Sequence, residues 1–512
     1  NLVAGTNVLA VEVHRISTVD NDAVFAAELQ ARVQLVPGTP ARESPESWIE
    51  LYNRGSNTVD LTGWRLDEGV DYRFAAGKTI PAGGYLVVAK DVDYLRSLYP
   101  HIDVVGPFTN KLSKSTDLLA LKDGNNNPVN EVRYFDGGYW PEAADGGGAS
   151  LELRDPWADN SKPEAWVASD EGAKSPWVWY TNRAVAVSSP QPPTTYNELV
   201  LGLLDTGECL IDDLRLVESP TNNPISLLQN GDFATGFKAW RVIGNHYGSV
   251  TPDPDNSGNP VLRLLATGAT EYLHNHAETT LKNGSAYYSI VNGRQYELSF
   301  RARWIAGNNR LNTRLWMNRT PRTFELAVPP LNGTPGARNS RYEANTGPTF
   351  ADLRHASAVP LANAPVTVSV AAGDPQGVAS CTLFWSVNGG AWRNTAMSPA
   401  PLSATRAEFT GLIPGAAAGA VVQFYVQAKD TLGAAATFPP AGPNSRALYQ
   451  VSDGRAQLNL AHNLRIIMVP ADTDLLLQAT NLMSNGRLGA TVIWDESEVY
   501  YDVGVRPKGS EH

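Results

Sequence analysis

The chain contains few cysteines and few charges. Only two of its 512 residues are cysteines, Cys209 and Cys381, so no disulfide framework can form. We expect both to be buried as small hydrophobic side chains. Charged residues make up 18% of the chain, against about 25% in an average soluble domain. The formal net charge is -11, whereas nucleic-acid-binding proteins typically carry a basic surface. We therefore expect no nucleic-acid partner.

Long hydrophobic runs are also missing. None approaches the roughly 18 apolar residues that a membrane-spanning helix needs. The chain is instead rich in turn formers and aromatic residues, with 44 glycines, 35 prolines, 13 tryptophans and 19 tyrosines. This mixture favours many short strands joined by tight turns. Because 512 residues exceed one hydrophobic core, the sequence predicts an all-β, multidomain string of β-sandwiches.

Predicted strands follow one another at regular spacing in residues 44–166. They cover 48–53, 59–66 and 85–89, and turns containing glycine or asparagine separate them. Such spacing is typical of an immunoglobulin-like β-sandwich. The region resembles the lamin-tail domain as bacterial proteins use it, and the resemblance rests on the strand 48–53, the motif Leu61-Thr62-Gly63-Trp64, the turn 80–85 and the segment 150–153.

Residues 167–335 carry the two ends of another sandwich in reversed order. Segments 199–204 and 207–217 resemble the last strands of a carbohydrate-binding-type, galactose-binding-like jelly roll, and 227–240 resembles its first strand. One permuted jelly roll is the simplest interpretation, and two incomplete ones are the alternative. The segment 331–340 then has the composition of a linker.

Three further regions complete the predicted domain order. Residues 1–36 hold two predicted strands, too few for a core, and resemble the C-terminal remnant of a galactose-binding-like jelly roll. Residues 347–452 resemble a fibronectin-III or immunoglobulin-like sandwich. Residues 460–512 combine a predicted helix within 472–483 with a hairpin at 488–506, and they resemble the N-terminal, α+β start of a CotH domain, which has a kinase-like fold. We therefore expect a fragment of a longer protein, whose signal peptide preceded the missing N-terminal part.

The CotH resemblance implies phosphoryl transfer, which needs carboxylates on Mg²⁺ and an aspartate that orients the nucleophile. Only Arg506, Lys508 and Gly509 stand in the matching positions, and Lys508 also fits a solvated turn. The carboxylates would lie beyond His512. We therefore expect no catalysis from this segment, although the intact protein would then carry a kinase-like domain.

Two acidic loops are candidates for a structural Ca²⁺, which prefers oxygen ligands. Asp213 and Asp232 stand where carbohydrate-binding-type jelly rolls bind this ion, and Asp253 and Asp255 form a second loop. Ala234 replaces an acidic residue that is usual in such sites. Because aspartate is also an ordinary turn residue, both interpretations stay open. No other cofactor is expected.

His274, His276 and Glu278 occupy every second position, which places all three side chains on one face of a predicted strand. Such a histidine pair can hold a transition metal, with His246 as a further ligand. The alternative is a pair of polar residues that line a groove or are exposed.

A glycan site needs flat aromatic side chains and polar groups that bind in pairs. In the segment 296–304, Phe300, Ala302 and Trp304 alternate with Arg301 and Arg303. We expect the aromatic face in the core and the arginine face as a candidate ligand wall. Two more residues, Arg314 and Trp316, would join this wall, and Trp177 and Trp179 are expected in the core.

These features predict a non-catalytic binding or scaffold segment of a secreted or cell-surface bacterial protein. Its expected role is adhesion or surface recognition, and its expected partners are glycans or another surface protein. The alternative is an accessory region of a CotH-like protein kinase.

Overall fold

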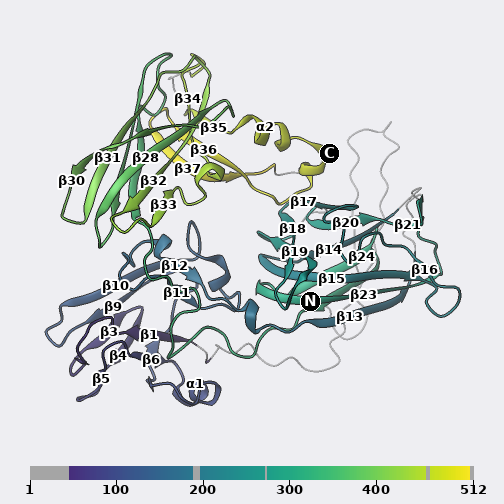
Figure 1. The fold of residues 1–512 in the computed structure, drawn as a ribbon, viewed down its shortest axis with the longest axis horizontal. Helices are drawn as coiled ribbons and strands as arrows, with labels where there is room; N and C mark the ends of the chain where they lie inside the picture. The colour runs from purple at the N-terminus through teal and green to yellow at the C-terminus, as the bar shows by residue number, and fades with distance from the viewer. Residues whose placement is uncertain are drawn as a thin grey trace, which may run out of the picture. The chain divides into compact units, whose positions relative to one another are not determined.

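The structure is a computed structural model that describes residues 45, 47–187, 197–270, 274–316, 318–456 and 462–507. The chain divides into two compact units, Asn1–Pro45 and Glu46–His512, and all elements named below lie in the second. The expected jelly-roll remnant at 1–36, like Lys508 and Gly509, lies outside the described residues. Antiparallel strands dominate (Figure 1), so the predicted all-β string of sandwiches is confirmed. None of the described helices is long and apolar enough to cross a membrane.

The first sandwich packs two sheets over one core. The sheets have the orders β1-β6-β7 and β10-β9-β3-β4-β8, and Leu66, Leu86 and Phe108 lie buried between them. The helix α1 (Val92–Leu98) begins where the Asp91 side chain accepts a hydrogen bond from the N–H of Tyr94. The strands are β1 (Trp48–Tyr52), β3 (Arg65–Glu68), β4 (Val70–Arg73), β6 (Tyr85–Ala89), β7 (Val104–Val105), β8 (Thr109–Asn110), β9 (Thr116–Lys122) and β10 (Pro128–Phe135).

The single strand expected at 59–66 is wrong. The chain forms β2 (Val59–Asp60), which pairs with β5 (Thr79–Ile80), and then turns before β3. Asp60 accepts hydrogen bonds from the N–H and hydroxyl of Thr62, and Gly63 adopts a φ of 79°. An aspartate that binds its own backbone two residues later favours a turn over a strand.

The segment 331–346, here called the return segment, follows the second sandwich and packs against the first. It contacts Glu50 on β1 and Glu152 on β11 (Leu151–Leu153), which pairs with β12 (Trp166–Ala168). Gly336 has a φ of 78°, and a Cβ there would lie 2.7 Å from Ile102. Only glycine combines this conformation with so close an approach.

The second sandwich is formed by a sheet here called the β15 sheet, with the order β13-β23-β15-β19-β18, and one called the β14 sheet, with the order β17-β20-β14-β24-β25. The strand β15 pairs with both β19 and β23, so the segment 207–218 lies inside one sandwich with the strands that follow it. The strands are β13 (Val178–Val185), β14 (Glu198–Leu203), β15 (Gly207–Glu218), β17 (Trp240–Ile243), β18 (His246–Asp253), β19 (Asn256–Ala266), β20 (His276–Thr280), β23 (Gln295–Gly307), β24 (Arg310–Leu315) and β25 (Arg319–Glu325).

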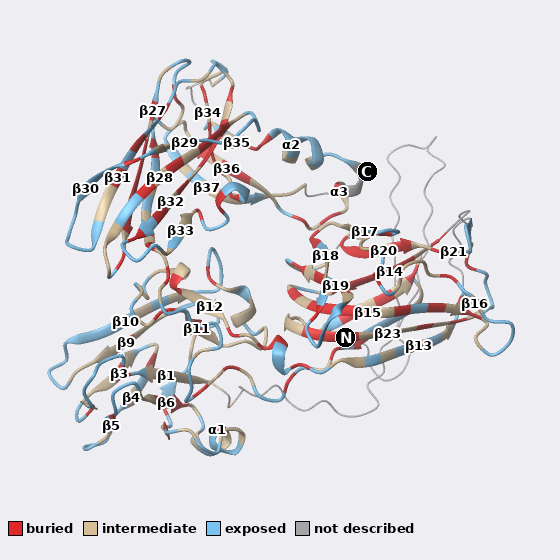
Figure 2. Cartoon of the chain, in the orientation of Figure 1, coloured by how far each residue is buried: buried red, intermediate tan, exposed pale blue. Residues whose placement is uncertain are grey.

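The core of this sandwich draws on both sheets. Figure 2 shows buried residues along β15, β19 and β23. Phe300, Ala302 and Trp304 are at most 1% exposed, so the prediction that they form the core face of their strand is confirmed. Cys209 is also fully buried, as expected, and burial raises the pKa of its thiol. The short strand β16 (Ile225–Ser226) also pairs with β15, and β21 (Lys282–Asn283) and β22 (Ala286–Tyr287) form a separate two-stranded sheet.

The third sandwich pairs β26-β27-β31-β30 with β29-β28-β32-β33, and β34 also pairs with β32. Its core includes Cys381, as predicted. The strands are β26 (Thr349–Ala356), β27 (Val366–Gly373), β28 (Val378–Val387), β29 (Arg393–Ala396), β30 (Ser398–Pro401), β31 (Arg406–Ile413), β32 (Val421–Asp430), β33 (Ala435–Phe438) and β34 (Ala447–Gln450).

A small sheet follows, with the order β35 (Leu464–Ile467), β36 (Leu488–Trp494), β37 (Glu498–Val505). It packs against the third sandwich through Leu448, Ile467 and Ile493, which are at most 3% exposed. The helix expected within 472–483 is two short helices, α2 (Pro470–Leu476) and α3 (Ala479–Leu482).

Candidate ligand-binding site

The polar face of the β14 sheet gathers side chains from four adjacent strands. On β14, Leu199, Leu201 and Leu203 are at most 1% exposed and belong to the core, so the alternate residues point to the opposite side. We call this side the outer face of the β14 sheet. Register places Arg241 opposite Glu278, Glu278 opposite Val200, and Val200 opposite Arg314. One row of side chains therefore crosses the sheet.

Carboxylates occupy one side of this row. Glu278 lies 2.7 Å from Arg241 Nε and 3.1 Å from His276 Nε2. Burial raises the pKa of Glu278, but the hydrogen bonds from His276 and Arg241 outweigh it and lower the pKa overall. For Glu198, burial and then the charge of Glu278 raise the pKa. Arg241 thus stabilises the charge of Glu278 more than that of Glu198, whose carboxylate is 3.9 Å away.

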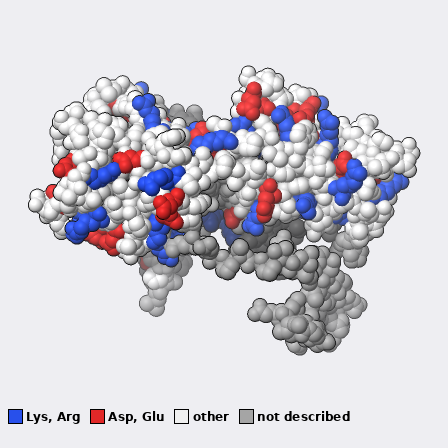
Figure 3. Space-filling view, turned by 90° about the horizontal axis from the view of Figure 1, so that it is seen from below, with Lys and Arg blue, Asp and Glu red and all other residues white. Residues whose placement is uncertain are grey.

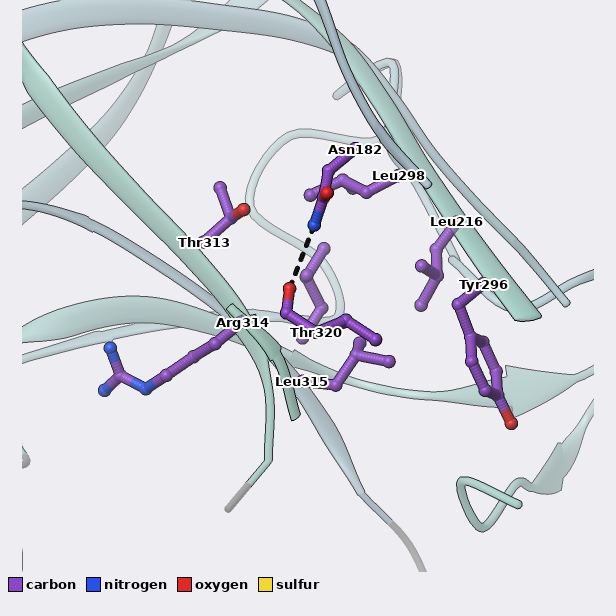
Figure 4. A pocket seen from close by; sticks show the side chains of 9 residues that line it. Asn182, Leu216, Tyr296, Leu298, Thr313, Arg314, Leu315 and Thr320 are labelled. Carbon is purple, nitrogen blue, oxygen red and sulfur yellow. Dashed lines mark hydrogen bonds between the residues drawn. The ribbon is translucent and has the colours of Figure 1, made fainter. Parts of the chain in front are cut away.

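Arg314 and Trp316 lie on the other side of the row. In Figure 4 the Arg314 side chain points away from Leu315 and Leu298, which line a cavity of about 10 Å³ inside the sandwich. Its guanidinium donates a 3.1 Å hydrogen bond to Asn312 Oδ1, and burial lowers its pKa. In the part of the chain that the structure describes, no carboxylate forms an ion pair with Arg314. The backbone N–H of Trp316 donates to the carbonyl of Glu198, which fixes this end of β24 to β14.

Of the histidines of the predicted metal site, His246 and His276 are buried and His274 is half-buried, and the three contact separate partners. His276 Nε2 contacts Glu278, and His246 Nδ1 lies 2.9 Å from Asn245 Oδ1. The backbone N–H of His274 donates to the carbonyl of Met483. Burial, with a smaller effect of His276, lowers the pKa of His246 to about 3. Among the described residues, no three His, Cys, Asp or Glu side chains are arranged to hold a metal ion.

The aspartates of the predicted calcium site contact arginines or their own loops. Asp213 and Asp253 both pair with Arg301, at 3.2 Å and 3.1 Å, and Asp255 pairs with Arg303 at 3.0 Å. Asp232 accepts a hydrogen bond from the N–H of Ala234. The structure therefore does not bring the four aspartates together.

Two of the four predicted wall residues lie on the β15 sheet, away from Arg314 and Trp316. Arg303 is 4% exposed, and its guanidinium donates to the carbonyl of Gly172 at 2.7 Å and 2.9 Å. Arg301 lies 4.4 Å from the centre of the Trp177 ring and 2.6 Å from Asp212. Both arginines are therefore held inside the fold by partners.

The expectation that Trp179 lies in the core is wrong, because its side chain is 57% exposed. Trp179 pairs with Arg301 in the register of β13 and β23, so it lies on the outer face of the β15 sheet. Alternation placed Trp177 and Trp179 on one face correctly, but it did not indicate which face meets the core.

Sequence reasoning missed Glu198, Arg241 and Asn312. The available signal was the alternation in 310–316, where Arg310, Asn312, Arg314 and Trp316 occupy every second position. Figure 3 shows acidic and basic side chains interleaved over the face in view.

Residues 32–136 match the family model of the Lamin Tail Domain. The match includes β1 to β10 of the first sandwich, so the predicted lamin-tail domain with its immunoglobulin-like fold is confirmed there. Such a domain is compatible with a non-catalytic binding or scaffold module. A search of curated proteins found no match to the chain.

Proposed function

We propose that the chain is a non-catalytic binding and scaffold segment of a secreted or cell-surface bacterial protein, and that it recognises glycans through the outer face of the β14 sheet. The observation that supports this most strongly is the row Arg241, Glu278, Val200, Arg314, because it lines up two guanidinium groups and a carboxylate across a rigid sheet, with the buried Val200 between Glu278 and Arg314. A sugar presents adjacent hydroxyls, each of which can donate and accept. Charged side chains in such pairs fix the orientation of a polyol.

An aromatic side chain and an amide complete the proposed site. Trp316 directly follows β24, and Asn312 lies two residues before Arg314 on the same face. An indole supplies a flat apolar surface for the C–H face of a sugar ring, while Asn312 supplies both a donor and an acceptor. Arg319 donates from Nε to the carbonyl of Trp316 at 2.8 Å, which holds the turn that carries this indole.

The remaining domains fit a scaffold role in this proposal. We assign 167–335 to a carbohydrate-binding-type jelly roll, 347–452 to a fibronectin-III or immunoglobulin-like module, and 460–512 to the start of a CotH-like domain. These three assignments rest on the sequence resemblances.

A glycan array tests the proposal. The labelled chain should bind a limited set of glycans, and Trp316→Ala should abolish the signal because the stacking surface is lost. Trp179→Ala is the matched control, since it removes an exposed tryptophan from the opposite sheet. Absence of glycan binding would contradict the proposal, as would equal binding by the parent chain and Trp316→Ala.

A further inference from the structure

We infer that the proposed site selects an anionic glycan, one that carries carboxylate or sulfate groups, and that the arginines of the β24–β25 hairpin bind those groups. This inference rests on the proposed function and names the class of glycan that the site takes.

The hairpin of β24 and β25 carries four arginines and one acidic residue, Glu325. Residues 310–322 contain four arginines and no aspartate or glutamate, although the whole chain carries a net charge of -11. Such a segment either repels itself or attracts anions. Because it forms an ordered edge of the sheet, an external anion is the simpler explanation.

These arginines also lack acidic partners, unlike others in the same sandwich. Arg183, Arg241 and Arg263 each form an ion pair with a glutamate on a neighbouring strand. Within the described ranges, no carboxylate lies within 4 Å of the hairpin's four guanidinium groups. Glu325 faces Arg310 in the register of β24 and β25 and still forms no ion pair with it. The four arginines that form no ion pair with a described carboxylate are Arg310, Arg314, Arg319 and Arg322.

The geometry separates ligand-facing arginines from a structural one. Arg319 donates to the carbonyl of Trp316 and to Asn197 Oδ1, so it holds the turn. Arg310 and Arg314 lie on the outer face, four residues and therefore about 14 Å apart along the strand. Asn312 lies between them, and its side chain orients the guanidinium of Arg314. The spacing of Arg310 and Arg314 suits a chain of sugars that carries anionic groups at regular intervals.

Desolvation strengthens the case at Arg314. Its side chain is half-buried, its pKa is lowered by burial, and no described carboxylate compensates the charge. A guanidinium that has lost water gains most from a carboxylate or sulfate, which it binds through two parallel hydrogen bonds. The same free energy is not available from a neutral hydroxyl.

The outer face argues against a phosphate polymer as the natural ligand. Glu198 and Glu278 share this face with Arg314, and they would repel a uniformly charged polyanion such as DNA. A glycan offers hydroxyls to the carboxylates and anions to the arginines, which fits both halves of the row.

Paired polymers test the inference. Titration calorimetry would compare polygalacturonate with its methyl-esterified form, and dextran sulfate with dextran, at one salt concentration. In at least one pair the charged form should bind about tenfold more tightly. Arg310→Ala and Arg314→Ala should each remove about that factor, and Arg314→Lys should recover part of it. The matched control Arg215→Ala removes an exposed arginine from the β15 sheet, and it should bind like the parent.

The outcomes separate the two proposals. Equal binding of the charged and neutral forms would overturn the inference and leave glycan recognition standing. Single-stranded DNA bound as tightly as the charged glycans would overturn it too, because the hairpin would then be an unselective polyanion site. No glycan binding of any kind would overturn the proposed function itself. Thermal melting of each variant checks that the fold is retained.

Discussion

The carboxylate of Glu50 accepts a 2.5 Å hydrogen bond from the backbone N–H of Gly336, 286 residues later in the chain. This contact fastens the return segment to the first strand of the lamin-tail domain. Along the chain, the second sandwich therefore lies between the first sandwich and a segment that packs back against it. Glu152 and Glu171 make similar contacts, with the hydroxyl of Thr334 at 2.8 Å and the N–H of Gly333 at 2.7 Å.

The first prediction concerns pH. Burial, together with a smaller repulsion from Glu152, raises the pKa of Glu50 to about 7, although the hydrogen bond from Gly336 opposes the shift. The folded pKa lies above the unfolded value, so the stabilisation is complete below about pH 4.5 and is lost as pH rises to about 7. Glu50→Gln should remove this loss and be more stable at pH 8 by about 1–2 kcal/mol.

Chemical unfolding of both proteins from pH 4 to 8 measures this difference. Glu142→Gln is the control, because that carboxylate is exposed. Parallel stability curves for Glu50→Gln and the parent would contradict the assignment.

The second prediction concerns Glu171, whose side chain has no exposed surface. Its carboxylate accepts from Ser169 Oγ, the N–H of Gly333 and Lys174 Nζ. Glu171→Ala leaves three donors without their acceptor and should reduce the free energy of unfolding by about 3 kcal/mol. Limited proteolysis should also cut the return segment faster. A variant with the parent's melting temperature and cleavage rate would show that the contact contributes little.

The third prediction concerns calcium. The guanidinium of Arg301 lies within 3.2 Å of three carboxylates, those of Asp212, Asp213 and Asp253, and so takes the place that a cation would occupy. Added Ca²⁺ or a chelator should therefore leave the melting temperature unchanged. Arg301→Ala should cost about 3 kcal/mol, because Asp212 and Asp253 stay buried without a counterion.

Differential scanning calorimetry measures both effects, with Arg215→Ala as the control on the same sheet. A rise in melting temperature of the parent chain with Ca²⁺ would contradict this interpretation.

The fourth prediction concerns His355 and Tyr501, which join the third sandwich to β37. The backbone N–H of His355 donates a 3.1 Å hydrogen bond to the hydroxyl oxygen of Tyr501. Burial lowers the pKa of His355 to about 4. Its folded pKa lies below the unfolded value of 6.5, so stability is complete above pH 6.5 and falls towards pH 4. In His355→Phe, the loss of folding stability between pH 6.5 and pH 4 should be smaller by about 2 kcal/mol.

Melting temperatures between pH 4 and 7 give the slope. His101→Ala, at an exposed position, should keep the slope of the parent. An unchanged slope in His355→Phe would mean that other groups cause the acid sensitivity.

Strand positions were predictable where turn residues flank an apolar run. The expected strand 85–89 coincides with β6, and the hairpin expected at 488–506 coincides with β36 and β37. The prediction of a strand at 59–66 failed because hydrogen bonds that Thr62 donates to the Asp60 side chain form a turn in place of the strand. Local pattern indicates which residues share a face, and local polar contacts can still interrupt it.

The site was only half predictable. Arg314 and Trp316 lie on the outer face of the β14 sheet, where alternation along β24 puts them. Arg303 alternates equally well, yet Gly172, 131 residues earlier, covers it. Periodicity carries no information about such distant partners, and for the same reason it did not indicate that Asp213 and Asp253 pair with Arg301.

The central claim is that the outer face of the β14 sheet binds glycan, and the dissociation constant of Arg314→Ala for the best array ligand tests it most directly. We predict a loss of about tenfold or more relative to the parent, with Arg215→Ala unchanged. Equal dissociation constants for the parent, Arg314→Ala and Arg215→Ala would place the binding surface elsewhere and contradict the claim.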